Sequence, residues 1–108
     1  MTNDQVTIAF EGDDVPLVEF AKAMGHFSGL LEALSQEISP NDKVQWTIYD
    51  LQAGSAIATA RGLCDSMEVV GSIANAYLGI GKALESGEAI NYSSNVQLHV
   101  NGILGVLN

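Results

Sequence analysis

LVEFAKAMGHFSGLLEALSQEI, residues 17–38, carries the strongest structural pattern in the chain. Large apolar residues recur in it with spacings of three and four, which is the period of an amphipathic helix. These residues are Leu17, Phe20, Met24, Phe27, Leu31, Leu34 and Ile38. The spacing predicts one long helix that buries this seam and ends at the turn residues 39–42.

The segments on either side of this helix alternate between apolar and other residues, as half-buried strands do. We expect strands at residues 5–11, 43–50 and 56–61, with Val44, Trp46 and Ile48 on one face of the second. The connection 51–55 is short and contains Gly54, which favours an antiparallel hairpin between the last two strands. The alanines of the third strand would let a helix approach the sheet closely.

A second helix is expected after Asp65 or Ser66, either of which can cap it. Residues 93–108 fit two structures. Their apolar residues have helical spacing, but they also alternate over residues 96–100, and Asn101-Gly102 is a typical two-residue hairpin turn. We favour the helix. The expected buried stripe of the second helix is Val70, Ile73, Tyr77, Ile80 and Leu84.

The predicted fold is therefore a two-layer α+β domain in the order β-α-β-β-α, followed by a C-terminal helix. Its amphipathic helices would cover one face of a small antiparallel sheet. The alternative is a final strand, which would give a ferredoxin-like βαββαβ arrangement. The length of 108 residues suits a single domain, residues 1–108, and we recognise no internal repeat.

Composition narrows the classes of function. Thirteen acidic residues against four basic ones give a net charge of −9, which argues against binding to nucleic acid or to an anionic membrane surface. The single cysteine excludes an intramolecular disulfide and fits a cytoplasmic protein. We see neither a signal peptide nor an apolar run long enough to span a membrane.

Residues 44–56, VQWTIYDLQAGSA, resemble part of a group of uncharacterised small bacterial or phage-encoded α+β domains. In these domains an amphipathic helix precedes a strand with a tryptophan and a Leu-x-x-Gly-Ser hairpin. Residues 85–88, ESGE, and Tyr92-Ser93 are similar as well. The resemblance implies a bacterial or phage protein, in a defence or counter-defence setting, and a helical C-terminus. It carries no activity over to this chain.

Candidate chemistry is sparse. Arg61, Gly62, Cys64 and Ser66 lie between a strand and a helix, where a small anionic or nucleotide ligand can bind to helical N–H groups. Cys64 is also a candidate nucleophile, although a buried thiol is the commoner role of such a cysteine.

Two other sets of residues are weaker candidates. Glu11, Asp13 and Asp14 form an acidic cluster that suits acid–base chemistry or, more simply, a turn and a helix cap. His26 and His99 lack a second ligand three or four residues away, so we expect no metal and no cofactor.

Surplus apolar surface is the main functional signal. The first helix has a second apolar or small-residue side that includes Leu30, and the C-terminal segment is very apolar. We expect Leu30, Ile103, Leu104 and Leu107 to form an interface between copies of the chain. The leading hypothesis is a non-enzymatic protein-interaction or assembly module that forms a homo-oligomer. A different protein is a further candidate partner. The alternatives are a small-ligand or nucleotide-binding protein, and a small enzyme that uses Cys64 or the acidic cluster.

Overall fold

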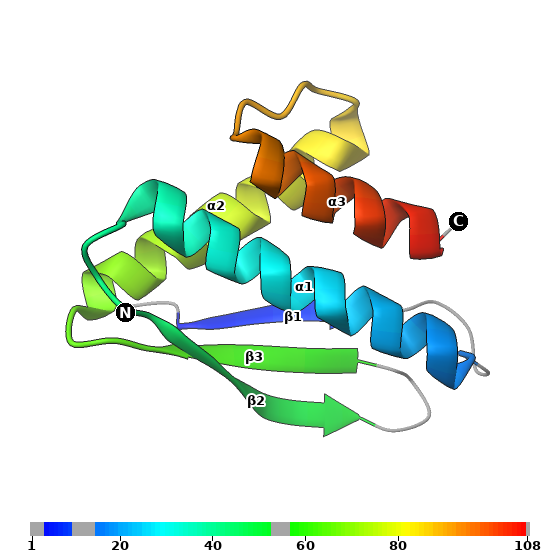
Figure 1. Cartoon of the computed structure of the whole chain (residues 1–108), viewed down its shortest axis with the longest axis horizontal. Helices are drawn as coiled ribbons and strands as arrows, with labels where there is room; N and C mark the ends of the chain where they lie inside the picture. Colours follow the sequence, from blue (N-terminus) through cyan, green and yellow to red (C-terminus); the bar gives the residue numbers. More distant parts are fainter. Residues whose placement is uncertain (1–3, 10–14, 53–56, 108) are drawn as a thin grey trace.

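The computed structural model describes residues 4–9, 15–52 and 57–107, of which residues 106 and 107 are described by their backbone alone (Figure 1). The predicted α+β class and the predicted order of elements are confirmed. The ferredoxin-like alternative is wrong, because residues 94–107 are a helix. The elements are β1 (Gln5–Ala9), α1 (Leu17–Ile38), β2 (Gln45–Gln52), β3 (Ile57–Leu63), α2 (Met67–Ser86) and α3 (Ser94–Leu107).

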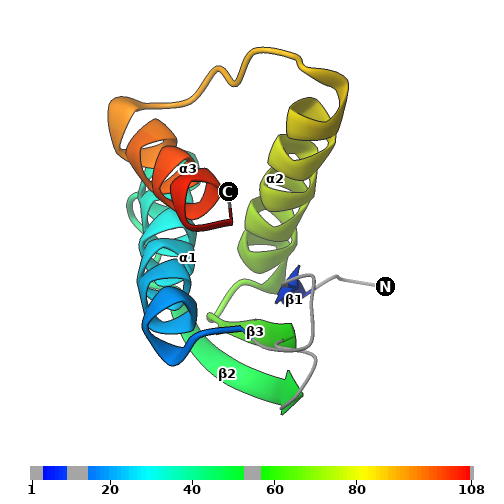
Figure 2. The same ribbon diagram turned by 90° about the vertical axis from the view of Figure 1, so that its right-hand side faces the viewer.

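The three strands form an antiparallel sheet in the order β1-β3-β2, with α1 and α2 side by side on one face (Figure 2). Every residue of the central strand that faces the helices is small, namely Ala58, Ala60 and Gly62. A Cβ atom on Gly62 would lie 2.7 Å from a methyl group of Val70 and 2.9 Å from the Trp46 ring. The close approach of helix and sheet predicted from the alanines is therefore present.

The edge strand β2 is tied to α1 through Trp46. Its indole N–H donates to Ser35 Oγ at 3.0 Å, and the Ser35 hydroxyl donates to the Leu31 carbonyl at 2.7 Å. These bonds satisfy a buried hydroxyl, since Ser35 is only 5% exposed. From Ile48, which is 58% exposed, to its end at Gln52, β2 is exposed, and a β-bulge shifts its pairing with β3 between Ile48 and Asp50.

Helix α1 buries two of its sides. The predicted seam faces the sheet through Phe27 and Leu31, although its first residue, Leu17, is 80% exposed. Helix α3 runs antiparallel to α1 and packs on its other apolar side, away from the sheet (Figure 1). Leu30 is consequently 2% exposed. Part of the apolar surface that seemed surplus in the sequence is thus covered by the chain itself.

Helical packing also accounts for α3 against the hairpin alternative. Val96 and Val100 lie on one side of α3, and both are buried in a cluster with Leu30, Leu34 and Ile73. The Val96 N–H donates to Ser93 Oγ at 3.4 Å at the start of the helix. Among the described residues, no helix is long and apolar enough to cross a membrane.

Candidate functional site

An apolar groove of about 600 Å³ opens between α2 and α3, with the edge of β1 and part of α1 beneath it. Figure 2 shows α2 on one side and α3, seen nearly end-on, on the other side above the sheet, joined by the segment 87–93. The groove is lined mainly by aliphatic side chains, and its only charged lining residues among those described are Lys82 and Glu85. We call this surface the α2–α3 groove.

Three of the four predicted interface residues meet in this groove. Leu30 lies at its bottom, where it belongs to the core and is not available as free surface, so its predicted place in an exposed interface is corrected. Ile103 and Leu104 are half-buried along the α3 wall. The side chain of Leu107 lies outside the described residues. The predicted residues therefore converge, but around a groove within one chain.

The opposite wall adds two leucines that the sequence interpretation did not place at an interface. Leu84, expected in the buried stripe of α2, is 39% exposed, and Leu78 is 47% exposed. Burying both in a partner would remove apolar surface from water at about 25 cal/mol per Å². Leu98 of α3 is 63% exposed but does not line the groove.

Tyr77 forms the part of the α2 wall next to β1. Its hydroxyl donates to the Thr7 carbonyl at 2.8 Å, and its ring meets the edge of Phe27, with 5.7 Å between the ring centroids. Desolvation by burial raises the pKa of Tyr77 from 10.0 to about 12. The Gly62 N–H donates to the Asp4 carbonyl, so alternation along β1 directs the Thr7 carbonyl to the outer edge of the sheet. Tyr77 therefore occupies one acceptor on that edge.

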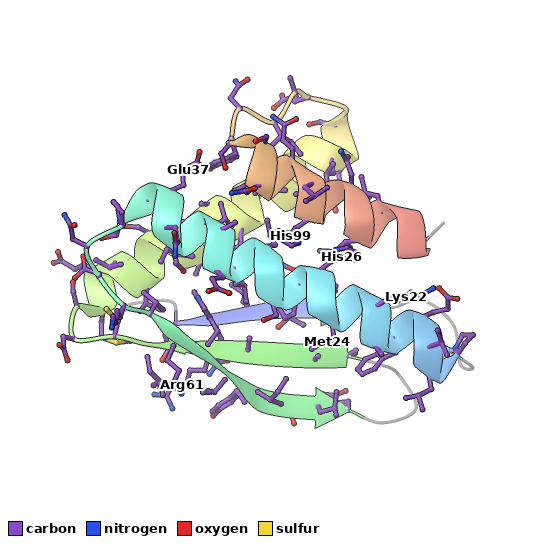
Figure 3. The ribbon with its side chains drawn as sticks, viewed as in Figure 1. Lys22, Met24, His26, Glu37, Arg61 and His99 are labelled. Atoms are coloured by element: carbon purple, nitrogen blue, oxygen red, sulfur yellow. The ribbon has the colours of Figure 1, made fainter. Side chains whose placement is uncertain are left out.

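The four residues predicted to bind a ligand do not share a site. Arg61 lies on the face of the sheet away from the helices (Figure 3), where its Nε pairs with an Asp4 carboxylate oxygen at 2.9 Å. Its guanidinium also lies 5.7 Å from the centre of the Tyr49 ring. Gly62 is buried on the opposite face under Trp46. Neighbours in a strand point to opposite faces, so these two residues cannot act together on one ligand.

Cys64 and Ser66 complete that predicted set. Cys64 is a half-buried free thiol in the wall of an open hollow of about 1160 Å³, which it shares with Asp42 and Asp65 among others. No histidine is among the described residues that line this hollow, so no imidazole there can take the thiol proton. Ser66 is the N-cap of α2 but makes no side-chain capping bond. The acidic cluster at residues 11–14 lies outside the described part of the chain.

A contact between the two histidines was not predicted from the sequence. His26 of α1 and His99 of α3 face each other with 5.8 Å between their ring centroids (Figure 3). A Cβ atom on Gly29 would overlap the His99 ring, and one on Gly102 would overlap the His26 ring. We call these four residues the histidine–glycine seam. His99 Nδ1 is buried there without a hydrogen-bond partner among the described residues.

The signal for this seam is visible in the sequence once it is sought. Residues 26–31 read HFSGLL and residues 99–104 read HVNGIL, so His-x-x-Gly followed by two aliphatic residues occurs twice. The match covers six residues, which is far shorter than the periods of about 20 residues or more that mark repeat architectures. The described residues contain no group of three or more His, Cys, Asp or Glu that could hold a metal ion.

The described site geometry suits binding through apolar contacts, and the groove is where such contacts are available. No protein-family model, curated protein or solved structure matches this chain.

Proposed function

We propose that this protein is a non-enzymatic interaction and assembly module that associates with further copies of itself through the α2–α3 groove. The observation that carries the proposal is the exposure of Leu78 and Leu84 beside the half-buried Ile103 and Leu104. Exposed leucines that border an apolar groove are typical of surfaces that bind other proteins.

Charge limits where a second copy can bind. The chain carries a net charge of −9, so two copies repel each other over most of their surfaces. The groove lining is an exception, because the charges of Lys82 and Glu85 cancel. Copies that meet through this surface bury apolar area and keep the remaining acidic residues in water.

The test is the oligomeric state of two lysine variants, measured by native mass spectrometry and light scattering. Leu84→Lys places a charge in the groove, whereas Leu98→Lys places the same charge on an exposed part of α3 outside it. We expect the wild type and Leu98→Lys to be oligomeric and Leu84→Lys to be shifted toward monomer by at least about tenfold in dissociation constant, or about 1.4 kcal/mol. A wild type that stays monomeric at high micromolar concentration would refute the proposal.

A small apolar ligand is a second candidate occupant of the same groove. A volume of about 600 Å³ lies within the usual range of small-molecule sites, and the Tyr77 hydroxyl and the Lys82 ammonium supply polar groups at its walls. Native mass spectrometry of gently purified protein tests this as well. A monomer that retains added mass, and loses it in Leu84→Lys, would favour the ligand over the second copy.

A further inference from the structure

The two repeated segments pack against each other in a reciprocal way. His26 of α1 lies over Gly102 of α3, and His99 of α3 lies over Gly29 of α1. The helices run antiparallel (Figure 1), so one pseudo-twofold axis relates HFSGLL at residues 26–31 to HVNGIL at residues 99–104. Each helix contributes a histidine side chain and, three residues later, a glycine that leaves space for the histidine of the other helix.

Such an interface is isologous, the type that also joins identical subunits. The hollow at Gly29 fits a His-x-x-Gly helix whatever chain supplies it. Nothing in the contact between the histidine–glycine residues depends on α1 and α3 belonging to the same molecule.

The attachment of α3 to the rest of the chain is compatible with exchange. Among the helices, α3 makes its extensive contact with α1, and it follows α2 through residues 87–93, which have no regular structure. This segment spans on the order of 25 Å when extended. It starts at Gly87, in the left-handed conformation with φ of 73°, which can change direction at low cost. The Ser93 N–H donates to a Glu37 carboxylate oxygen at 2.8 Å, so this hydrogen bond at the end of the connecting segment is also made with α1.

The geometry points to exchange of α3 between two copies, each copy's α3 packing on the α1 of the other. This inference rests on the proposed function, because exchange requires that copies associate, and it adds to the groove a second contact between them, the packing of α3 on the partner's α1. The exchanged dimer would contain two histidine–glycine seams and two α2–α3 grooves. Its partner is a second copy of this chain, since that copy supplies the same His-x-x-Gly helix.

A released α3 cannot remain unpartnered. Without it, Leu30 and Leu34, which are 2% and 0% exposed, would lose their cover, as would Val96 and Val100 on α3 itself. Exposing four aliphatic side chains to water is strongly unfavourable, because the burial of apolar surface is the main contribution that stabilises a fold. An opened chain therefore either closes again on itself or closes on another opened chain, and concentration decides between these outcomes.

Steric complementation tests the exchange directly. Gly29→Leu overfills the seam against His99, whereas His99→Gly leaves a hollow opposite Gly29. In an exchanged mixed dimer, the enlarged side chain at position 29 of one copy meets the hollow at position 99 of the other, and the second seam is the unaltered Gly29–His99 pair. We expect co-refolded variants to form a mixed dimer whose Tm exceeds that of either variant alone by about 5 °C or more. Mixing Gly29→Leu with wild type is the matched control, because His99 still meets the enlarged side chain there.

Each outcome of this experiment discriminates. Mixed dimers in statistical proportion, with no rise in Tm, would refute exchange and leave assembly through the groove in place. The absence of any dimer, in the variants and in the wild type, would refute both.

A disulfide keeps the test valid if Gly29→Leu does not fold. In a chain with Cys64→Ser, the pair His26→Cys and Gly102→Cys places two thiols across the seam, where the helices already approach closely. Oxidation at high protein concentration should give a covalent dimer on a non-reducing gel. A covalent monomer alone would overturn the exchange.

Discussion

Glycines on α1 differ in what surrounds them. A side chain at Gly29 would overlap the His99 ring, whereas a Cβ atom on Gly25, one turn earlier in the helix, would meet nothing within 4 Å. Alanine favours a helix over glycine by about 1 kcal/mol at either position. Adding a side chain to a packed interface lowers stability by about 1–3 kcal/mol, and of these two glycines only Gly29 is at such an interface.

We therefore predict opposite effects for two matched substitutions. Gly25→Ala should stabilise the protein by up to about 1 kcal/mol, and Gly29→Ala should destabilise it by about 1–2 kcal/mol. Urea unfolding at neutral pH measures both. Equal stabilisation by the two alanines would mean that the His99 ring does not lie on Gly29.

Tyr77 gives a prediction for alkaline pH. Its pKa is raised to about 12 in the folded protein because ionisation would place a charge in a desolvated wall of the groove. The folded state holds this proton more tightly than the unfolded chain does. The stability that depends on it is therefore complete below about pH 10 and falls as the pH rises toward 12.

The free energy of unfolding of the wild type should accordingly decrease between about pH 10 and 12 more steeply than that of Tyr77→Phe. The variant loses the hydrogen bond to Thr7 at every pH, so the slope and not the absolute stability is compared. Parallel slopes would show that the hydroxyl is accessible to water when folded.

Individual residues were predicted well where burial alone decides their position. Phe27, Leu31, Ile73 and Ile80 are in the core, as their spacing indicates. Arg61 and Gly62 illustrate the opposite case. They are adjacent in sequence, but strand geometry separates them onto two faces. The third strand was expected to end at residue 61, whereas β3 continues to Leu63.

At the scale of elements, the end of α2 differs from its middle. Gly87 caps the helix in the left-handed region, with its N–H directed to the Ala83 carbonyl, whereas Gly79 is in an exposed helical position with nothing within 4 Å of its Cβ site. Gly79→Ala should raise stability by about 1 kcal/mol. Gly87→Ala should lower it by a similar amount, because alanine resists a positive φ.

Thermal unfolding of the two variants checks this pair. If Gly87→Ala were neutral, the loop after α2 would have to adopt another conformation without loss. Such a result would also weaken the role given to Gly87 as the point where residues 87–93 change direction.

The periodicity of the sequence predicted the helices and strands, but it did not predict which of them pack against each other. Asn101-Gly102 is typical of a hairpin turn, yet it lies within α3, at a position where a Cβ atom on Gly102 would overlap the His26 ring. Local sequence patterns indicate only which secondary structure a segment can form by itself. The contact that decided between helix and hairpin joins two helices that lie near opposite ends of the sequence.

At the scale of the whole molecule, net charge opposes association. A dimer brings together two chains that each carry −9, and salt screens their repulsion over about 10 Å at 0.1 M ionic strength. We predict that the dissociation constant of the dimer decreases as NaCl is raised from about 20 to about 500 mM. Sedimentation equilibrium measures it.

Leu84→Lys is the informative comparison in the same titration. It should remain weaker than the wild type at every salt concentration, because its defect is the burial of a charge. A wild-type dimer that weakens with salt would indicate that ion pairs, and not apolar contacts, hold the copies together.

The overall class could be predicted because the helix period, the strand alternation and the hairpin agree. The site could be predicted only in part. Ile103 and Leu104 were predicted as interface residues because the C-terminal segment is very apolar, and they line one wall of the groove. The opposite wall depends on where α2 lies relative to α3, which no local pattern encodes.

The position of β3 between β1 and β2 has a consequence for the order of folding. The hairpin of β2 and β3 closes locally, whereas Thr7 and its hydrogen-bonded neighbour Thr59 are 52 residues apart in the chain. On a ribosome, β1 is therefore synthesised well before the strand that it pairs with, and it has no strand partner until β3 emerges. We expect β1 to join the sheet late in folding, after the hairpin has formed.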